Sequence, residues 1–186
     1  MLIYDKLLEY AEKNPDKIAL VNSRTQISYR ELSFWIRNIS SDLFKKFSPG
    51  DKVIIKVKDP IKGLLYLYGA AAANLVSILI EADLSANEEK SILEKVRPES
   101  ISDSSLLSLD NNLVNDNSIC ISKNFKADEE LFKVKEDQIF LGALSSGSTG
   151  KAKVIWRDHQ SWTSAFDIQR EIFSLNQNSK LLITGS

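Results

Sequence analysis

Cysteine, histidine and continuous apolar runs are scarce in this chain of 186 residues, and each shortage excludes a class of protein. Cys120 is the only cysteine, so the chain can form no internal disulfide framework and has no cysteine cluster to hold zinc. Residues 1–17 mix charges among their apolar positions and lack the apolar core of a secretion signal, and no segment approaches a membrane span. We therefore expect a cytoplasmic location and no transmembrane segment.

The chain also lacks an excess of charge of either sign. Its 24 lysines and arginines nearly balance its 25 aspartates and glutamates, so no global field attracts nucleic acid or cationic partners. The single histidine, His159, has no evident nucleophile or acid to work with and gives little support to a general base. Composition thus indicates no nucleic-acid partner and names no other.

Apolar patterns in the first half of the chain alternate between helix and strand. A short amphipathic helix precedes a hairpin, and residues 29–47 predict a helix with one buried stripe. Residues 52–80 predict a strand, a helix and a second strand, which together make one βαβ unit. Ser85 begins a further predicted helix.

The second half is less regular. Residues 109–118 predict a surface loop, and the strand that follows contains Cys120. Strands are predicted at 138–144 and 153–156, a helix runs from about residue 160 to 173, and a last strand begins at Lys180.

Residues 145–153, "SSGSTGKAK", join two of these predicted strands. They are not a Walker A loop, because Ser145 stands where that motif needs its first glycine and Ala152 where it needs a magnesium-binding hydroxyl. Their glycines expose successive amide hydrogens, and their hydroxyls and lysines add donors and positive charge, so the segment fits an oxyanion. The same composition is common in flexible polar turns, and the density of donors alone leaves both interpretations open.

The segment closely resembles the phosphate loop of the adenylate-forming synthetases, a family of acyl-CoA synthetases, luciferases and peptide-synthetase adenylation domains. Three further matches occur in the family's order. Residues 14–32 are similar to its opening, which ends in Thr/Ser-Tyr-x-Glu-Leu, and residues 48–59 are similar to its Gly-Asp-x-Val strand. His159 follows Lys153 by six residues, where many members carry Ser-His or Thr-His before a helix.

This resemblance implies a set of phosphate-binding residues: Ser145, Ser146, Gly147, Ser148, Thr149, Gly150, Lys151 and Lys153. It implies ATP, Mg²⁺ and CoA, used in a two-step reaction on a small carboxylic acid. The carboxylate displaces pyrophosphate from the α-phosphorus of ATP to give acyl-AMP, and the CoA thiol then takes the acyl group. His159 and Trp162 would line the substrate pocket. Trp162 and Phe166 resemble the acyl-CoA synthetases more than the peptide-synthetase modules, and the expected acid is a fatty acid.

The resemblance also implies a layered α/β fold with a mostly parallel sheet flanked by helices, as in the large N-terminal domain of these enzymes. Residues 1–186 would be the N-terminal part of the AMP-binding domain, without the C-terminal domain and its catalytic lysine. We expect no adenylation by these residues alone. Two alternatives stay open: a non-catalytic nucleotide-binding module, and an interaction module that self-associates through uncovered apolar surface.

Overall fold

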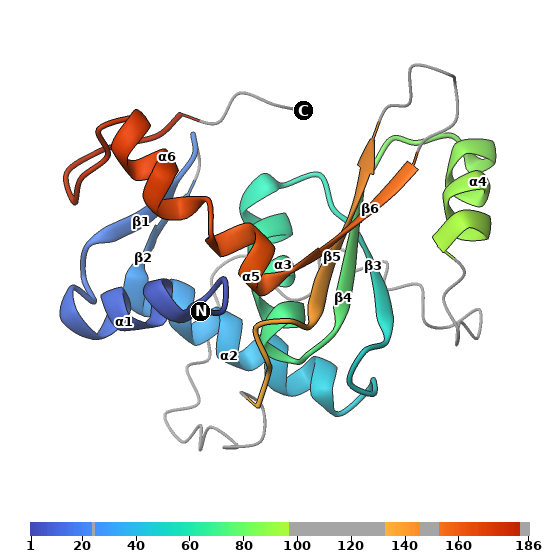
Figure 1. Ribbon diagram of the computed structural model, residues 1–186, viewed down its shortest axis with the longest axis horizontal. Helices are drawn as coiled ribbons and strands as arrows, with labels where there is room; N and C mark the ends of the chain where they lie inside the picture. The colour runs from blue at the N-terminus through green and yellow to red at the C-terminus, as the bar shows by residue number, and fades with distance from the viewer. Residues whose placement is uncertain (24, 97–132, 146–152, 183–186) are drawn as a thin grey trace.

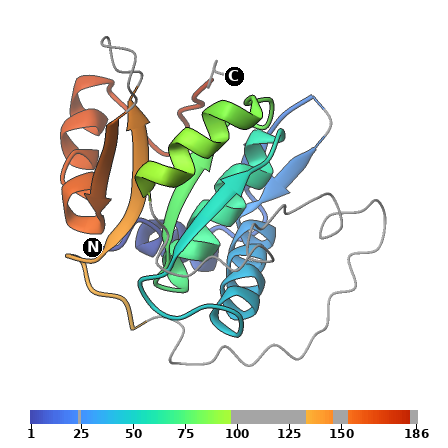
Figure 2. The same cartoon turned by 90° about the vertical axis from the view of Figure 1, so that its right-hand side faces the viewer.

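The computed structural model describes residues 1–23, 25–96, 133–145 and 153–182. They form a four-stranded sheet with helices on both faces and a two-stranded hairpin beside the first helices (Figures 1 and 2). The elements in chain order are α1 (Asp5–Lys13), β1 (Ile18–Val21), β2 (Gln26–Ser28), α2 (Tyr29–Phe44), β3 (Lys52–Lys56), α3 (Pro60–Ala72), β4 (Val76–Ile80), α4 (Ala86–Val96), β5 (Ile139–Ser145), β6 (Lys153–Asp158), α5 (His159–Thr163) and α6 (Phe166–Ile172). The layered α/β fold predicted from the sequence is confirmed.

The large sheet is mostly parallel. β3, β4 and β5 run in the same direction, and β6 pairs antiparallel with β5 at the edge, in the order β3-β4-β5-β6. Parallel strands need a crossover, which α3 provides between β3 and β4. Their central residues are buried on both faces, which explains the nearly unbroken apolar runs at residues 53–55 and 75–80.

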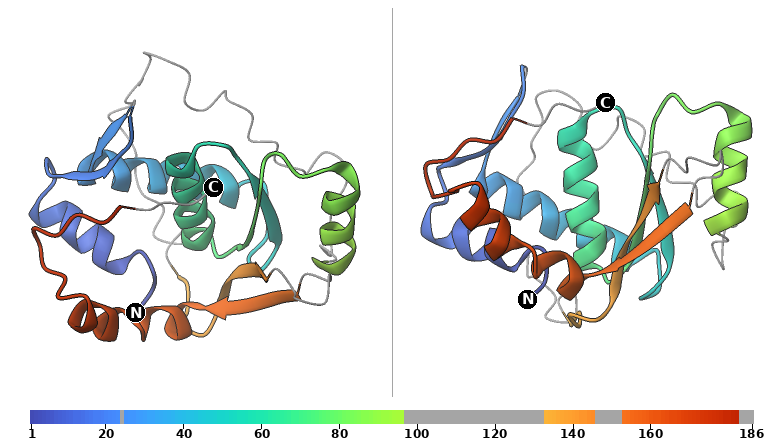
Figure 3. Two further views of the ribbon diagram at one scale, coloured as in Figure 1. Left: turned by 90° about the horizontal axis from the view of Figure 1, so that it is seen from above. Right: turned by 45° about the horizontal axis from the view of Figure 1, so that its top comes forward.

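Different helices cover the two faces of the sheet (Figure 3). Val53 and Ile55 belong to the larger apolar cluster, which includes residues of α2 and α3. Ile54 and Ile78 belong to a second cluster with Ile92 of α4. Successive strand residues point to opposite faces, so three consecutive residues of β3 serve both layers.

Side-chain caps begin α2 and α3. Ser28 Oγ accepts a hydrogen bond from the Glu31 amide (3.3 Å), and the Ser28 amide donates to Glu31 Oε2 (2.8 Å), which makes a capping box for α2. Asp59 Oδ1 accepts from the Ile61 amide (2.8 Å) and caps α3, with Pro60 in the first helical position. The Asp59 cap therefore turns the chain from β3 into α3.

One predicted helix is interrupted. The helix predicted over about 160–173 is two helices, α5 and α6, separated at Ser164 and Ala165. Ser164 Oγ donates to the Ser161 carbonyl (3.0 Å), and the Ala165 amide, which would use that carbonyl in a continuous helix, turns to the Trp162 carbonyl (3.4 Å). The serine hydroxyl thus competes with the helical hydrogen-bond ladder.

Some predictions fall at or beyond the limits of the described residues. The strand predicted from Lys180 is not formed at residues 180–182, the part of it that the structure describes. The loop predicted over 109–118 and the strand that contains Cys120 lie outside the described residues. Of the helices within the described ranges, none is long and apolar enough to cross a membrane.

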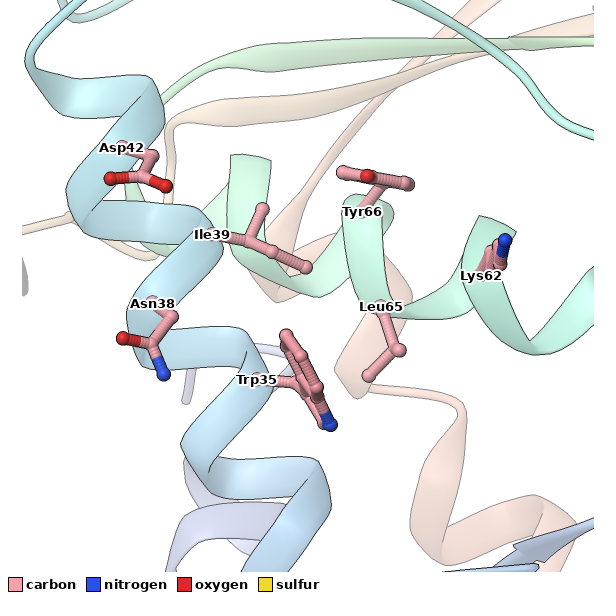
Figure 4. Close-up of a pocket in the computed structure, with 7 residues that line it drawn as sticks. All are labelled: Trp35, Asn38, Ile39, Asp42, Lys62, Leu65 and Tyr66. Atoms are coloured by element: carbon pink, nitrogen blue, oxygen red, sulfur yellow. The ribbon is translucent and has the colours of Figure 1, made fainter. Parts of the chain in front are cut away.

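Helices α2 and α3 approach closely at Gly69. A Cβ placed there would lie 2.4 Å from Ile39 Cγ2 and 2.8 Å from Ile39 Cβ. Beside this crossing is a cavity of about 30 Å³ whose lining residues come from both helices (Figure 4): Trp35, Asn38, Ile39, Asp42, Lys62, Leu65 and Tyr66. This cavity has room for a water molecule and not for a nucleotide.

Gly69→Ala should lower the free energy of unfolding by about 1–3 kcal/mol, because the new methyl group overlaps Ile39. Gly63→Ala is the matched control in the same helix, since its Cβ would meet Val57 Cγ2 at an ordinary 3.5 Å. Because alanine has a higher helix propensity than glycine, Gly63→Ala should raise the free energy of unfolding by up to about 1 kcal/mol. Urea unfolding compares the two variants, and a Gly69→Ala chain as stable as Gly63→Ala would contradict the close packing.

Candidate functional site

Ser145 and Lys153 are the two predicted loop residues that the structure describes. Ser145 ends β5 and pairs in register with Lys153, which begins β6. Ser145 Oγ accepts from the Lys153 amide and donates to the Lys153 carbonyl, each at 3.4 Å. The other predicted residues of this loop lie outside the described residues: Ser146, Gly147, Ser148, Thr149, Gly150 and Lys151. The structure therefore places the two ends of the predicted loop side by side.

These loop ends lie at the carboxyl-terminal edge of the sheet, which is the edge formed by the carboxyl ends of the parallel strands (Figure 1). β3 ends at Lys56, β4 at Ile80 and β5 at Ser145. In open parallel sheets, ligands bind beyond the carboxyl ends of the strands. α3 and α4 follow β3 and β4 and begin at this same edge, and the positive ends of their dipoles favour an anion there.

Lysines at this edge differ in whether they are paired. Lys56 Nζ lies 2.6 Å from Glu89 Oε2, and Lys58 Nζ lies 2.8 Å from Asp83 Oδ1. The hydrogen bond to Asp83 raises the pKa of Lys58. Lys153 is exposed, and within the described part of the chain its ammonium group makes no ion pair. Among the described residues, no carboxylate competes with an added anion for this ammonium group.

His159, predicted as a pocket residue, begins α5 and is only 1% exposed. Its Nδ1 accepts a hydrogen bond from the Ile3 amide (3.2 Å), and its ring stacks on Phe140 with the centroids 4.8 Å apart. Burial lowers the pKa of His159 to about 4, although the negative charge of Asp5 opposes this shift. The ring is neutral at pH 7, as an accepting Nδ1 requires.

Trp162, the second predicted pocket residue, is 42% exposed. Its ring meets Phe140 edge-on, with the centroids 6.1 Å apart and the planes at 89°. Phe140 thus brings His159 and Trp162 together, beyond the opposite end of β6 from Lys153. A strand of this length extends roughly 20 Å. The assignment of His159 and Trp162 to a substrate pocket stays a prediction.

Sequence reasoning missed the part that residues 1–4 play around α5. Besides the Ile3 amide, the Met1 carbonyl accepts a hydrogen bond from Thr163 Oγ1 (3.2 Å), and the Met1 amine forms an ion pair with Glu136. The two residues of the Ile3–His159 contact are separated by 156 positions in the sequence, and those of the Met1–Thr163 contact by 162 positions. No local pattern indicates such pairs, because the N-terminal residues resemble any apolar start of a helix.

Comparison with known proteins gives one family. A family model described as "AMP-binding enzyme" matches residues 7–185. The protein named "Uncharacterized acyl--CoA ligase YhfT" of Bacillus subtilis (strain 168) is 28% identical over 187 residues, which cover 95% of this chain and 38% of that protein. The nonribosomal peptide synthetase atnA of Emericella nidulans is 25% identical over 192 residues, which cover 96% of this chain and 3% of that protein.

A solved structure gives the same fold. The fatty acyl-adenylate ligase from L. pneumophila, in complex with acyl adenylate and pyrophosphate, matches with a TM-score of 0.71 and 17% identity over 94% of this chain. The match covers 33% of that protein. At this identity the likeness concerns the fold alone. The chain spans less than two fifths of the length of each of these three proteins.

The buried neutral ring of His159 should make stability depend on pH. Its pKa is 6.5 without the fold and about 4 within it, so below about pH 6.5 the unfolded chain binds a proton that the folded chain does not. The stabilisation is complete above that pH and falls by on the order of 3 kcal/mol as the pH approaches 4.

Urea unfolding between about pH 4 and pH 7 measures this loss in the wild type and in His159→Phe. Carboxylates that titrate in the same range are common to both chains and cancel in the comparison. In His159→Phe, the free energy of unfolding should fall less steeply between pH 7 and pH 4, because the contribution of the histidine is absent. Parallel stability curves for the two chains would mean that His159 titrates alike in the folded and unfolded states.

Proposed function

This chain belongs to the AMP-binding enzyme family, and we propose that it is the N-terminal part of an acyl-CoA synthetase. The family membership confirms the resemblance that the sequence motifs indicated. In this proposal the full-length enzyme uses ATP to convert a carboxylic acid into acyl-AMP and then transfers the acyl group to CoA. The acid, expected to be a fatty acid, and the CoA acceptor belong to the proposal, since the relatives include both an acyl–CoA ligase and a peptide synthetase by name.

The observation that carries the proposal is the position of the Ser145–Lys153 pair. It lies beyond the carboxyl ends of three parallel strands, where nucleotide phosphates bind in related architectures. Lys153 offers an ammonium group without a carboxylate partner among the described residues. Within the proposal, residues 146–152 add hydroxyl and amide donors between these two ends.

The chemistry asks these residues to hold the leaving group and not to form a covalent bond. As the acid attacks the α-phosphorus, negative charge moves onto the β and γ phosphates, which depart as pyrophosphate. Lys153 and the donors of the loop would stabilise that charge, because they are positioned before the reaction starts. Mg²⁺, bound mainly through the phosphates, would neutralise part of the same charge.

The remaining assignments follow from the same proposal. Residues 1–186 form the N-terminal part of an adenylation domain, and the catalytic lysine of the family lies in a later domain of the full-length protein. The half-exposed Trp162 lines the acid pocket, whereas His159 reaches that pocket only through the aromatic residues packed on it. The expected cytoplasmic location also stays a prediction.

Lys153→Ala should weaken the binding of Mg·ATP to the 186-residue chain by about three- to tenfold, the range for losing one charged hydrogen bond at an accessible site. Lys46→Ala is the matched control, because Lys46 is also exposed and lies just before β3, at the other edge of the sheet. Titration calorimetry measures both dissociation constants. Equal affinities in the two variants would remove Lys153 from the phosphate site.

The interaction module is a second candidate function, favoured by one observation. Several large apolar side chains after β6 are 60–88% exposed: Ile168, Ile172, Phe173, Leu181 and Leu182. Apolar surface of this kind drives association. If association is the function, gel filtration should give a mass that rises with concentration, and Ile172→Lys should abolish the rise. A monomer at every concentration would exclude this candidate.

A further inference from the structure

In the pairing of β5 with β6, one residue of β5 has no partner in β6. Ile139 lies opposite Asp158 and Leu141 lies opposite Arg157, so Phe140 has no partner in the ladder. This arrangement is a β-bulge, which shifts the pairing register by one residue along one strand. All pairs beyond it, up to Ser145 opposite Lys153, depend on that shift.

The register decides which residues stand at the end of the hairpin. A ladder continued from the Ile139–Asp158 pair without a bulge would place Ser145 opposite Ala152 and Leu144 opposite Lys153. A one-residue shift also turns side chains to the opposite face of a strand. Val154, which packs with Leu144 on the α4 side of the sheet, would lose that contact.

Phe140, the bulged residue, packs against His159. Both side chains are 1% exposed, and their rings stack with 4.8 Å between centroids and 26° between planes. The His159 ring also meets Tyr4 edge-on, with the ring centroids 6.1 Å apart. The bulged residue is therefore fixed from outside the sheet, by a ring that belongs to the helix after β6.

His159 is in turn held at three points. Its Nδ1 accepts from the Ile3 amide (3.2 Å), its amide donates to the Gln138 carbonyl (3.3 Å), and its carbonyl accepts from Thr163 Oγ1 (2.9 Å). Of these, only the Ile3 bond restrains the ring itself. A buried ring with one fixed hydrogen bond and two aromatic neighbours has little freedom to turn.

We propose that His159 is a positioning residue that sets the register of the β5–β6 hairpin and so places Ser145 opposite Lys153 at the phosphate site. The ring keeps Phe140 in the bulge, and the Ile3 amide keeps the ring against Phe140. The functional part of this inference rests on the proposed phosphate-binding role of the loop. The structural part concerns the hairpin alone.

Cross-linking of paired cysteines distinguishes the two registers. In a Cys120→Ser background, Ala143→Cys with Ile155→Cys reports the register of the structure, because these residues are opposite each other. Ala143→Cys with Val154→Cys reports the register without the bulge. Disulfides form only when the two Cα atoms are within about 7 Å and the Cβ atoms face each other. Mass spectrometry of the oxidised chains gives the ratio of the two cross-links.

His159→Leu removes both the ring and the acceptor, and it should raise the share of the bulge-free cross-link about tenfold over the wild type. His159→Phe keeps a ring and removes only the acceptor, and it should raise that share about threefold, the factor that one net hydrogen bond gives. Gln160→Leu, at the exposed neighbouring position, should leave the ratio unchanged. If His159→Leu gives the same ratio of the two cross-links as the wild type, the proposal is overturned. If the leucine variant does not fold, the same criterion applies to His159→Phe.

Calorimetry with Mg·ATP then tests the functional part, on chains that keep the native residues at 143, 154 and 155. A variant in which a larger fraction of the molecules adopts the bulge-free register should bind Mg·ATP more weakly, and the loss of affinity should increase with that fraction. Unchanged affinity in such a chain overturns the link between register and site. If the wild type itself does not bind Mg·ATP, the proposed function fails, and the cross-linking ratio still decides whether His159 sets the register.

Discussion

Pairing of β5 with β4 is the contact on which the candidate site depends. More than fifty residues separate the two strands in sequence, yet Ser77 pairs with Leu141 and Ile78 with Gly142. Because this pairing is parallel, it brings the end of β5 to the edge where β3 and β4 also end. A two-stranded hairpin is marginally stable by itself, so the β5–β6 hairpin depends on β4 for its rigidity as well as its position.

Side chains of both neighbouring layers support this pairing. Phe140 and Leu141 enter the core with α2 and α3, and Leu144 packs with the α4 cluster. At Gly142 the Trp156 ring lies so close to the backbone that a Cβ would meet Trp156 Cζ3 at 2.8 Å. β5 is therefore packed on both faces, whereas most of β6 is exposed.

The sequence predicted the α/β order well because its signals are local. Periodic apolar residues, the Ser28–Glu31 capping box and the Asp59 cap act within one helix or strand. The break between α5 and α6 escaped prediction, since it depends on whether the Ser164 hydroxyl takes one particular carbonyl. The pairing of Ser145 with Lys153 agrees with the strands predicted on either side of residues 145–153, whereas the phosphate-binding role of those residues came from the family resemblance and stays a prediction.

The surroundings of His159 could not be predicted, for a different reason. Its contact with Ile3 joins residues that are 156 positions apart in the sequence, and the bulged Phe140 packs on the His159 ring from another element. From its position, His159 is predicted to be a pocket residue, which stays a prediction; the structure adds its contacts with Ile3, Tyr4 and Phe140, which no local pattern indicates. Burial depends on the whole fold, and a single local motif carries no information about it.

A titration of the isotopically labelled 186-residue chain with Mg·ATP, followed by amide chemical shifts, tests the central claim most directly. The account predicts that the largest shifts fall on residues 145–153 and on the first turns of α3 and α4, which begin at the same edge of the sheet. Shifts confined to other surfaces, or no shifts at millimolar nucleotide, would contradict the assignment of a phosphate site to the end of the β5–β6 hairpin.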